Sequence, residues 1–289
     1  MQRSTSLFIL STLAGLLALA EAAAGLFWTG GGAPFDFTTL HGQSVQINGQ
    51  GLYFYDTLFK APILRGTDAV TLCAALPLLV VALLLYRRGR LTGGLLLAGA
   101  LAYLLYNAAS LALGAAYNNL FLLYVAYFSA SLFAFILAFS AIDPQQLAGR
   151  AGNGLPRGGM AALLFLAGLA LLAAWLGDIL SALLQGSVPA IASYTTEATY
   201  VFDLGIIAPL CFLSGILLLR RAPLGLPLAA ILLVLLAIVG VMVTVQTLFQ
   251  MQAGITLGAG EFIGKAGSFM LLALVAAGLL ARFFRCLEA

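Results

Sequence analysis

The stretch PLGLPLAAILLVLLAIVGVMVTVQTLF, residues 223–249, contains no charged side chain. A helix of this length, rising 1.5 Å per residue, spans the ~30 Å of hydrocarbon in a bilayer. Because lipid offers the backbone no hydrogen-bond partner, such a stretch must satisfy its own amides and carbonyls as an α-helix. We therefore predict a transmembrane helix here.

Seven further apolar segments are long enough to cross a bilayer. They fall at residues 6–28, 67–86, 91–113, 118–141, 159–185, 199–219 and 262–283. The chain has 289 residues, of which 63% are hydrophobic and 8% are charged, whereas a soluble domain has about 25% charged residues. The sequence thus predicts an all-α integral membrane protein with eight transmembrane helices, surrounded by the lipid bilayer. The first segment is longer than the apolar part of a signal peptide and contains Glu21, so it is expected to be retained.

The basic residues indicate the orientation. With the N-terminus in the cytoplasm, only Lys60, Arg65 and Lys265 of the 13 Lys and Arg residues lie outside, as the positive-inside rule requires. Eight spans then place the C-terminus inside as well. Arg outnumbers Lys, and Ala and Leu are abundant, which suggests a bacterial inner membrane protein. The basic residues are too few and scattered for a nucleic-acid surface.

The loops suggest two halves. The first outer loop, residues 29–66, contains alternating residues at 43–47 and 50–55 around Asn48-Gly49, a pattern typical of a β-hairpin. Residues 142–158 are polar and rich in Gly, and they predict a flexible cytoplasmic linker between halves at 1–141 and 159–289.

The second and sixth segments resemble each other. Each has an acidic residue near its outer end, an internal proline (Pro77 and Pro209) and an Arg pair at its inner end. Four spans repeated twice would form a 4+4 parallel internal repeat. The alternative is a chance likeness between two Leu- and Ala-rich segments that end in Arg.

Most acidic residues gather toward the outer side. Eight of the ten lie there: Glu21, Asp36, Asp56, Asp68, Asp178, Glu197, Asp203 and Glu261. Glu21, Asp178 and Asp203 are predicted to lie within hydrocarbon. A carboxylate at a helix centre costs at least ~2.5 kcal/mol, so such groups face the bundle interior or water. We expect these three to converge on one outward-facing polar cavity.

Two of the acidic residues have structural alternatives. Asp68 begins its predicted segment, where it could cap the helix and pair with Arg65. Glu21 shares a helix face with Ala14, Ala18 and Gly25, which favours close helix packing.

Polar side chains follow the third and fourth segments at helical spacing. They are Tyr103, Tyr106, Asn107 and Ser110 in the third, and Tyr117, Tyr124, Tyr127 and Ser131 in the fourth. The favoured interpretation of the tyrosines is an interfacial aromatic belt, which fits Tyr117 best and Tyr127 least. The alternative is that Tyr106, Asn107 and Tyr124 line the polar cavity.

Residues for catalysis or cofactor binding are scarce. His41 is the only histidine, which excludes bis-His haem and makes a Ser-His-Asp triad depend on a loop residue. Cys73, Cys211 and Cys286 follow no metal or redox spacing. No catalytic, metal or cofactor residues are therefore expected, and an enzyme is the less favoured class.

Three function classes remain. The favoured one is a proton- or cation-coupled transporter of a small solute, because repeated halves around intramembrane acids suit alternating access. A non-catalytic subunit, sensor or assembly factor would instead pair its acids with Lys60, Arg65 and Lys265 and bind a membrane protein partner. A membrane-embedded enzyme would act on a lipid-linked substrate of the outer leaflet, with a carboxylate as base and Lys265 or Arg65 binding phosphate.

Overall fold

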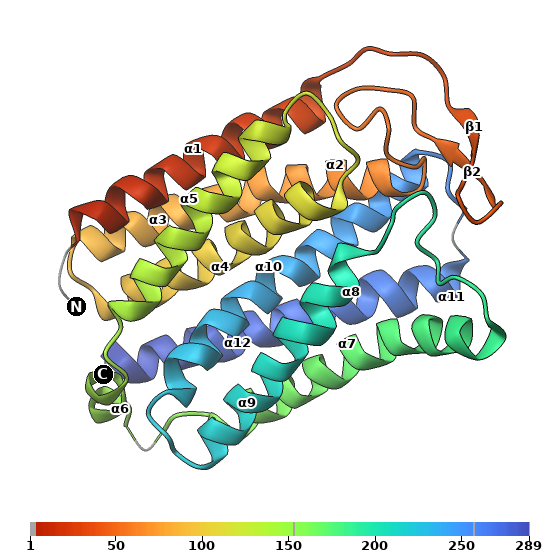
Figure 1. The fold of residues 1–289 in the computed structure, drawn as a ribbon. Helices are drawn as coiled ribbons and strands as arrows, with labels where there is room; N and C mark the ends of the chain where they lie inside the picture. Colours follow the sequence, from red (N-terminus) through yellow and green to blue (C-terminus); the bar gives the residue numbers. More distant parts are fainter. Residues whose placement is uncertain (1–3, 153, 257, 289) are drawn as a thin grey trace.

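The computed structural model describes residues 4–152, 154–256 and 258–288, and at residues 259, 261 and 265 it describes the backbone alone. Within this part of the chain, eight helices are long and apolar enough to cross a membrane, which confirms the predicted class. The helices form one bundle, and the start of α1 and the end of α12 lie at the same end of it (Figure 1). The β-hairpin lies at the other end of the bundle, which we call the hairpin end.

Five spans are single α-helices. They are α1 (Thr5–Phe27), α4 (Leu91–Gly114), α5 (Phe121–Ser140), α7 (Arg157–Gln185) and α10 (Gly225–Gln252). Each of the others is interrupted by a π-helical turn, a feature that is often found at functional sites. These are α2 (Lys60–Val70), η1 (Thr71–Ala75) and α3 (Leu76–Arg87) in the second span; α8 (Ala198–Phe202), η2 (Asp203–Ile207) and α9 (Ala208–Leu219) in the sixth; and α11 (Ala259–Phe262), η3 (Ile263–Gly267) and α12 (Ser268–Glu288) at the eighth.

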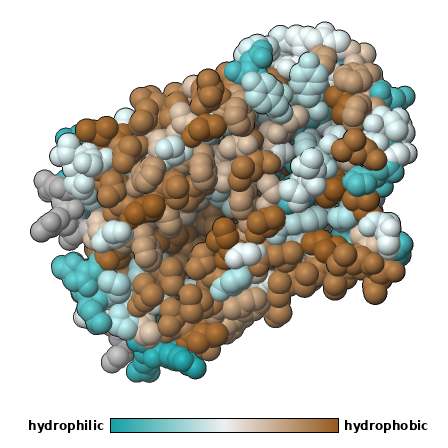
Figure 2. All heavy atoms as spheres, viewed as in Figure 1, coloured by the Kyte–Doolittle hydropathy of each residue, from teal (hydrophilic) through white to brown (hydrophobic). Residues whose placement is uncertain are grey.

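The surface fits a membrane environment. Hydrophobic residues cover the middle of the face drawn in Figure 2, and hydrophilic residues gather at the two ends. Large apolar side chains of the spans, such as Leu166, Leu213 and Leu274, are exposed, and lipid tails would cover them.

The second span begins earlier than predicted. Its helix starts at Lys60 instead of residue 67, and Pro62 lies in the first turn, where its missing N–H costs no hydrogen bond. Asp68 consequently lies two turns inside the helix and is buried. The interpretation of Asp68 as a helix cap is therefore wrong.

The predicted hairpin is present, but its turn is elsewhere. β1 (Phe35–Thr38) pairs antiparallel with β2 (Ser44–Ile47), and the turn is at residues 39–43. Residues 50–55 form turns in place of the predicted strand. The reason is that the Asn48 side chain donates hydrogen bonds to the carbonyls of Gln50 and Tyr53, which folds this segment back on itself.

The centre of the bundle is formed by α4 and α10, which contact each other. α3 and α5 pack on α4, while α9 and α12 pack on α10. Gly99 of α4 faces Val234 of α10, and Gly240 of α10 faces the backbone of Phe269 in α12. Small residues at these positions let the helices approach closely, as is usual in membranes.

The second and sixth spans share backbone features at matching positions. η1 ends two residues before Pro77, and η2 ends two residues before Pro209. In the turns that follow these spans, Gly89 and Arg221 both have positive φ, at 77° and 55°. The separation along the sequence is the same for η1 and η2, for Pro77 and Pro209, and for Gly89 and Arg221.

The likeness continues into the next helix. Gly93 faces the backbone of residues 85–86, and Gly225 faces the backbone of residues 217–218, again at the same separation. The predicted linker, residues 142–158, is not wholly irregular, because Asp143 caps the short helix α6 (Pro144–Arg150) through the amides of Gln145 and Gln146.

Candidate functional site

Two carboxyl groups face one hydroxyl group inside the bundle. The hydroxyl oxygen of Tyr53 lies 3.0 Å from Oε1 of Glu21 and 2.8 Å from Oδ2 of Asp68. Both carboxyl side chains are fully buried, and Tyr53 is 1% exposed. We call Glu21 and Asp68 the carboxyl pair. Among the described residues, their remaining oxygens, Oε2 of Glu21 and Oδ1 of Asp68, have no hydrogen-bond partner.

Three segments build this arrangement. Glu21 comes from α1, Asp68 from α2, and Tyr53 from the loop between them, whose turns direct it into the bundle. Gly25 lies one turn beyond Glu21, and a Cβ there would overlap the Asp68 carboxylate and lie 2.8 Å from the Tyr53 hydroxyl. The absence of a side chain at Gly25 therefore makes room for the pair.

A polar interior continues from the carboxyl pair. Thr71 of η1 and Tyr103 of α4 share a 3.1 Å hydrogen bond, one turn beyond Asp68. Asn118 donates to the Tyr124 hydroxyl at 3.0 Å. Tyr103, Tyr124 and Tyr127 are all buried. The aromatic-belt interpretation is therefore wrong for these three tyrosines and fits Tyr117, which is exposed.

Two predicted candidates extend this interior. Asn107 is buried on α4, and its Nδ2 has no hydrogen-bond partner within the part of the chain that the structure describes. On the same helix, Tyr106 donates a 3.0 Å hydrogen bond to Oδ1 of Asp203 in η2.

Asp203 is bound by side chains from two different spans. Besides Tyr106, it accepts a 2.8 Å hydrogen bond from Nε1 of Trp175 in α7. Both of its oxygens thus have donors, and its side chain is 7% exposed. One residue of α4 and one of α7 therefore hold this carboxyl in place.

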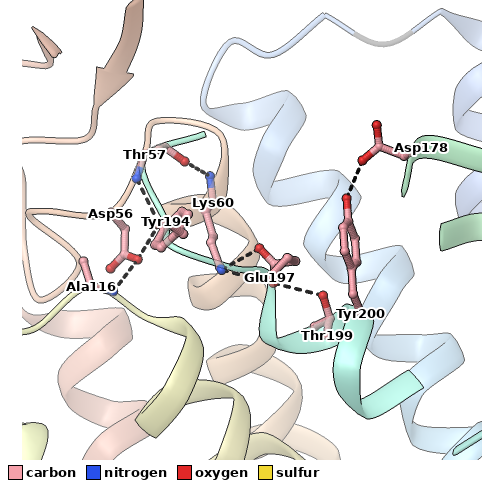
Figure 3. Close-up of polar contacts among 9 residues, drawn as sticks. All are labelled: Asp56, Thr57, Lys60, Ala116, Asp178, Tyr194, Glu197, Thr199 and Tyr200. Atoms are coloured by element: carbon pink, nitrogen blue, oxygen red, sulfur yellow. Dashed lines mark hydrogen bonds and ion pairs between the residues drawn. The ribbon is translucent and has the colours of Figure 1, made fainter. Parts of the chain in front are cut away.

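A second polar network lies at the hairpin end (Figure 3). Oδ1 of Asp56 accepts hydrogen bonds from the Tyr194 hydroxyl at 2.7 Å and from the Ala116 amide at 2.9 Å. Lys60 forms a 3.0 Å ion pair with Glu197, and its ammonium lies 3.9 Å from the centre of the Tyr194 ring. We call Asp56, Lys60, Tyr194 and Glu197 the hairpin-end clasp, because they join the first outer loop and α2 to the segment before α8.

The electrostatics of this region follow from burial. Burial raises the pKa of Asp56 from 3.8 to about 6, although the Ala116 amide, the Tyr194 hydroxyl and the charge of Lys60 act in the opposite direction. Burial also raises the pKa of Tyr194 and that of Tyr53. These hydroxyls consequently keep their hydrogens and act as donors.

The predicted acids do not share one set of contacts. Glu21 meets Asp68 through Tyr53, and Asp203 is held by Tyr106 and Trp175. Asp178 accepts hydrogen bonds from the Tyr200 hydroxyl at 2.7 Å and from the Ala190 amide at 2.9 Å. Figure 3 shows the Asp178–Tyr200 contact to one side of the clasp.

Among the described residues, neither predicted cation forms an ion pair with the carboxyl pair. Arg65 is exposed and donates a 3.3 Å hydrogen bond to the Leu26 carbonyl. The Lys265 side chain, like that of Glu261, lies outside the described part of the chain.

Several functional candidates emerge only in three dimensions. Tyr53, Trp175 and Tyr194 contact four buried carboxyls, those of Glu21, Asp68, Asp203 and Asp56. No pattern in the sequence distinguishes these three residues. Within the described residues, no group of three or more His, Cys, Asp or Glu residues could hold a metal ion. Comparison of the chain with family models, with curated proteins and with solved structures finds no match.

Proposed function

We propose that this polytopic membrane protein is a proton- or cation-coupled transporter of a small solute, with the carboxyl pair as its ion-binding site. The observation that carries the proposal is that Glu21 and Asp68, both fully buried, face the same hydroxyl oxygen. No ion pair to Lys or Arg balances either of them among the described residues.

The chemistry of this contact favours a bound proton or cation. Tyr53 has one hydroxyl hydrogen, which it can donate to only one carboxylate. Two charged carboxylates side by side in a low-dielectric interior repel each other, and each is costly to bury without a partner. A proton or a cation on the pair relieves both costs. The partnerless oxygens of Glu21 and Asp68 are available to bind it.

The surrounding helices support alternating access. The π-helix η1 begins three residues after Asp68, and η2 begins at Asp203. The matching prolines and turns of the second and sixth spans support halves at residues 1–141 and 159–289, related as a 4+4 parallel repeat. In this conformation the carboxyl pair is fully buried and in contact with Tyr53, and the hairpin-end clasp joins the loops before α2 and α8.

The orientation belongs to the same proposal. The end of the bundle opposite the hairpin carries Arg87, Arg88, Arg150, Arg157 and Arg220, as the cytoplasmic side of a membrane protein would. The hairpin end is then the outer face of a bacterial inner membrane, and both termini are cytoplasmic.

Reconstitution tests the proposal. Protein in liposomes that contain the pH-sensitive dye pyranine is exposed to gradients of NaCl, KCl, choline, putrescine, alanine or glucose, and solid-supported-membrane currents are recorded in parallel. At least one solute should drive a proton flux or a current. Glu21→Gln and Asp68→Asn should each reduce it at least about tenfold, since each removes one ionisable group from the pair.

Asp143→Asn is the matched control. It neutralises a carboxyl outside the bundle, and Asn caps a helix as well as Asp does. A flux that survives in both pair variants, or no response to any of the solutes, would contradict the proposal.

A partner-binding subunit or sensor is the second candidate, because the hairpin exposes apolar side chains. Phe35, Phe37 and Leu40 are all exposed, and Leu40 in the turn is 94% exposed. Exposed apolar groups outside the membrane are typical of a contact surface. Pull-down of a constant stoichiometric partner that is lost in Leu40→Ser would favour this role.

A further inference from the structure

A cleft at the hairpin end lies beside the segment that covers the carboxyl pair. Its volume is about 350 Å³, within the range of roughly 300–1,000 Å³ that is usual for small-molecule sites. Three aromatic residues line it: Trp28, Phe54 and Tyr55. Asn118 and Asn119 add amide groups, and the lining contains no charged residue.

Glycines keep this cleft open. Gly30 and Gly31 have φ of 149° and 117°, which only glycine adopts readily, and nothing lies within 4 Å of a Cβ built on Gly30. Gly51 has φ of 61°, and a Cβ there would lie 2.7 Å from the Trp28 carbonyl oxygen. Larger residues at these positions would strain the backbone or fill the space.

The cleft and the carboxyl pair are connected through neighbouring residues. Leu52 lines the cleft, and the next residue, Tyr53, contacts both carboxyls. Trp28 follows Glu21 by seven residues along α1, a rise of ~10 Å. Asn118, which also lines the cleft, donates to the buried Tyr124. A movement of the short segment 51–55 would therefore change access to the pair.

We propose that this cleft binds a small organic cation, an alkylammonium group, and that such amines are the substrate class of the transporter proposed above. The inference rests on that function. Aromatic faces attract ammonium groups, and cages of aromatic residues are a common way to hold them. The cleft supplies three rings without a competing Lys or Arg, and Phe54 and Tyr55 pack edge to face at 4.9 Å.

The acidic groups near the cleft, which belong to the carboxyl pair, favour a cation over a neutral solute. A hydroxylated neutral solute could also stack on Trp28 and bond to Asn118. However, Tyr53, the residue after the cleft-lining Leu52, contacts the carboxyl pair, which offers Oε2 of Glu21 and Oδ1 of Asp68 without partners in the described chain. A cation at the carboxyl pair would balance the negative charge that protons otherwise balance. Amine and proton would then compete for the pair, and transport would exchange one for the other across the membrane.

Trp28 can report on binding directly. The chain contains two tryptophans, Trp28 and Trp175, so Trp175→Phe leaves Trp28 as the only one. Choline chloride, titrated at constant ionic strength, should change its emission saturably. The uncharged carbon analogue 3,3-dimethylbutan-1-ol should bind at least about tenfold more weakly. Titration calorimetry on the wild-type protein makes the same comparison without a substitution at Trp175.

Substitutions locate the site. Tyr55→Leu removes one ring from the cleft and should weaken choline binding about 3- to 10-fold. Tyr117→Leu is the matched control, because Tyr117 is exposed and does not itself line the cleft, although Asn118 and Asn119 of the same loop do. Equal binding of choline and its neutral analogue, or an equal effect of the two substitutions, would overturn the inference.

The flux assay separates this inference from the function on which it rests. If choline does not bind while another solute drives a flux that depends on Glu21, the cation inference fails and the transporter stands. If choline binds in the cleft and no solute drives such a flux, the site is supported and the transporter fails.

Discussion

The Tyr194 hydroxyl donates a 2.7 Å hydrogen bond to Oδ1 of Asp56, a carboxyl with no exposed surface. Asp56 belongs to the loop before the second span, and Tyr194 belongs to the loop before the sixth. The bond thus joins the loops before the second and sixth spans at the hairpin end. Since burial raises the pKa of Asp56 to about 6, this junction is sensitive to pH.

Acidification should strengthen the fold through Asp56. Its pKa is about 6 in the folded chain against 3.8 for a free side chain, so between these values the folded state binds more protons than the unfolded state. The free energy of unfolding therefore rises as pH falls through 6 and levels off near 4, by at most roughly 3 kcal/mol. Thermal unfolding in detergent at pH 7.5 and pH 5 measures this change.

Asp56→Asn isolates the contribution of this residue, because all other carboxyls remain. The asparagine oxygen can still accept from Tyr194, and no proton uptake is needed at this position. The gain in melting temperature at pH 5 should be smaller than in the wild type. Asp36→Asn, in an exposed position of β1, should keep the wild-type gain. Identical pH dependence in wild type and Asp56→Asn would show that the burial of Asp56 has no energetic effect.

Tyr53→Phe should destabilise the protein in a pH-dependent way. The substitution removes the hydroxyl that contacts both members of the carboxyl pair, and an unsatisfied buried acceptor costs about 1–3 kcal/mol. The loss should be larger at pH 8 than at pH 5, because carboxyls that hold protons can bond to each other. Melting curves at both pH values test this. Tyr117→Phe, at an exposed tyrosine, is the control and should have no measurable effect on stability. An equal loss of stability at both pH values in Tyr53→Phe would contradict the proposed proton site.

The spans could be predicted from the sequence because lipid imposes a simple rule. Long apolar segments must be helical, so all eight were located, with boundaries that differ by a few residues at most ends. The largest difference is at the start of the second span, because the polar residues Lys60 and Arg65 occupy its first two turns. These residues lie at the hairpin end, where Lys60 is paired with Glu197 and Arg65 is exposed. The eighth span is also displaced, from the predicted 262–283 to Ser268–Glu288.

The site could be predicted only in part, because its members come from separate segments. Depth in the membrane identified Glu21 and Asp203, but the sequence does not state which helix faces meet. Tyr53 lay in a predicted strand, and its position depends on the side chain of Asn48, which forms turns in place of a hairpin. Hydrophobic periodicity contains no information on such a contact.

Gly25→Ala should disrupt the carboxyl pair. A Cβ at this position would overlap the Asp68 carboxylate, so α1, α2 or Tyr53 must shift. Overpacking of this kind costs about 1–3 kcal/mol, and solute-driven flux should fall with it. Gly177→Ala is the control within another span, because nothing lies within 4 Å of its Cβ. Alanine there should be neutral or slightly stabilising. Equal melting temperatures for the two variants would contradict the close contact at Gly25.

Asp203 should couple the two halves energetically. It accepts hydrogen bonds from Tyr106 of α4 and Trp175 of α7, and an asparagine there offers one acceptor to two donors. Asp203→Asn should therefore destabilise the fold by about 1–3 kcal/mol. In a Trp28→Phe background, Trp175 is the only tryptophan, and its emission should shift when its acceptor changes.

A double-mutant cycle with Tyr106→Phe gives the decisive measurement. The two losses should be less than additive, with a coupling of about 0.5–3 kcal/mol, since both substitutions break the same bond between the halves. Additive losses would mean that Tyr106 and Asp203 do not interact, and the contact between the halves would then depend on packing alone.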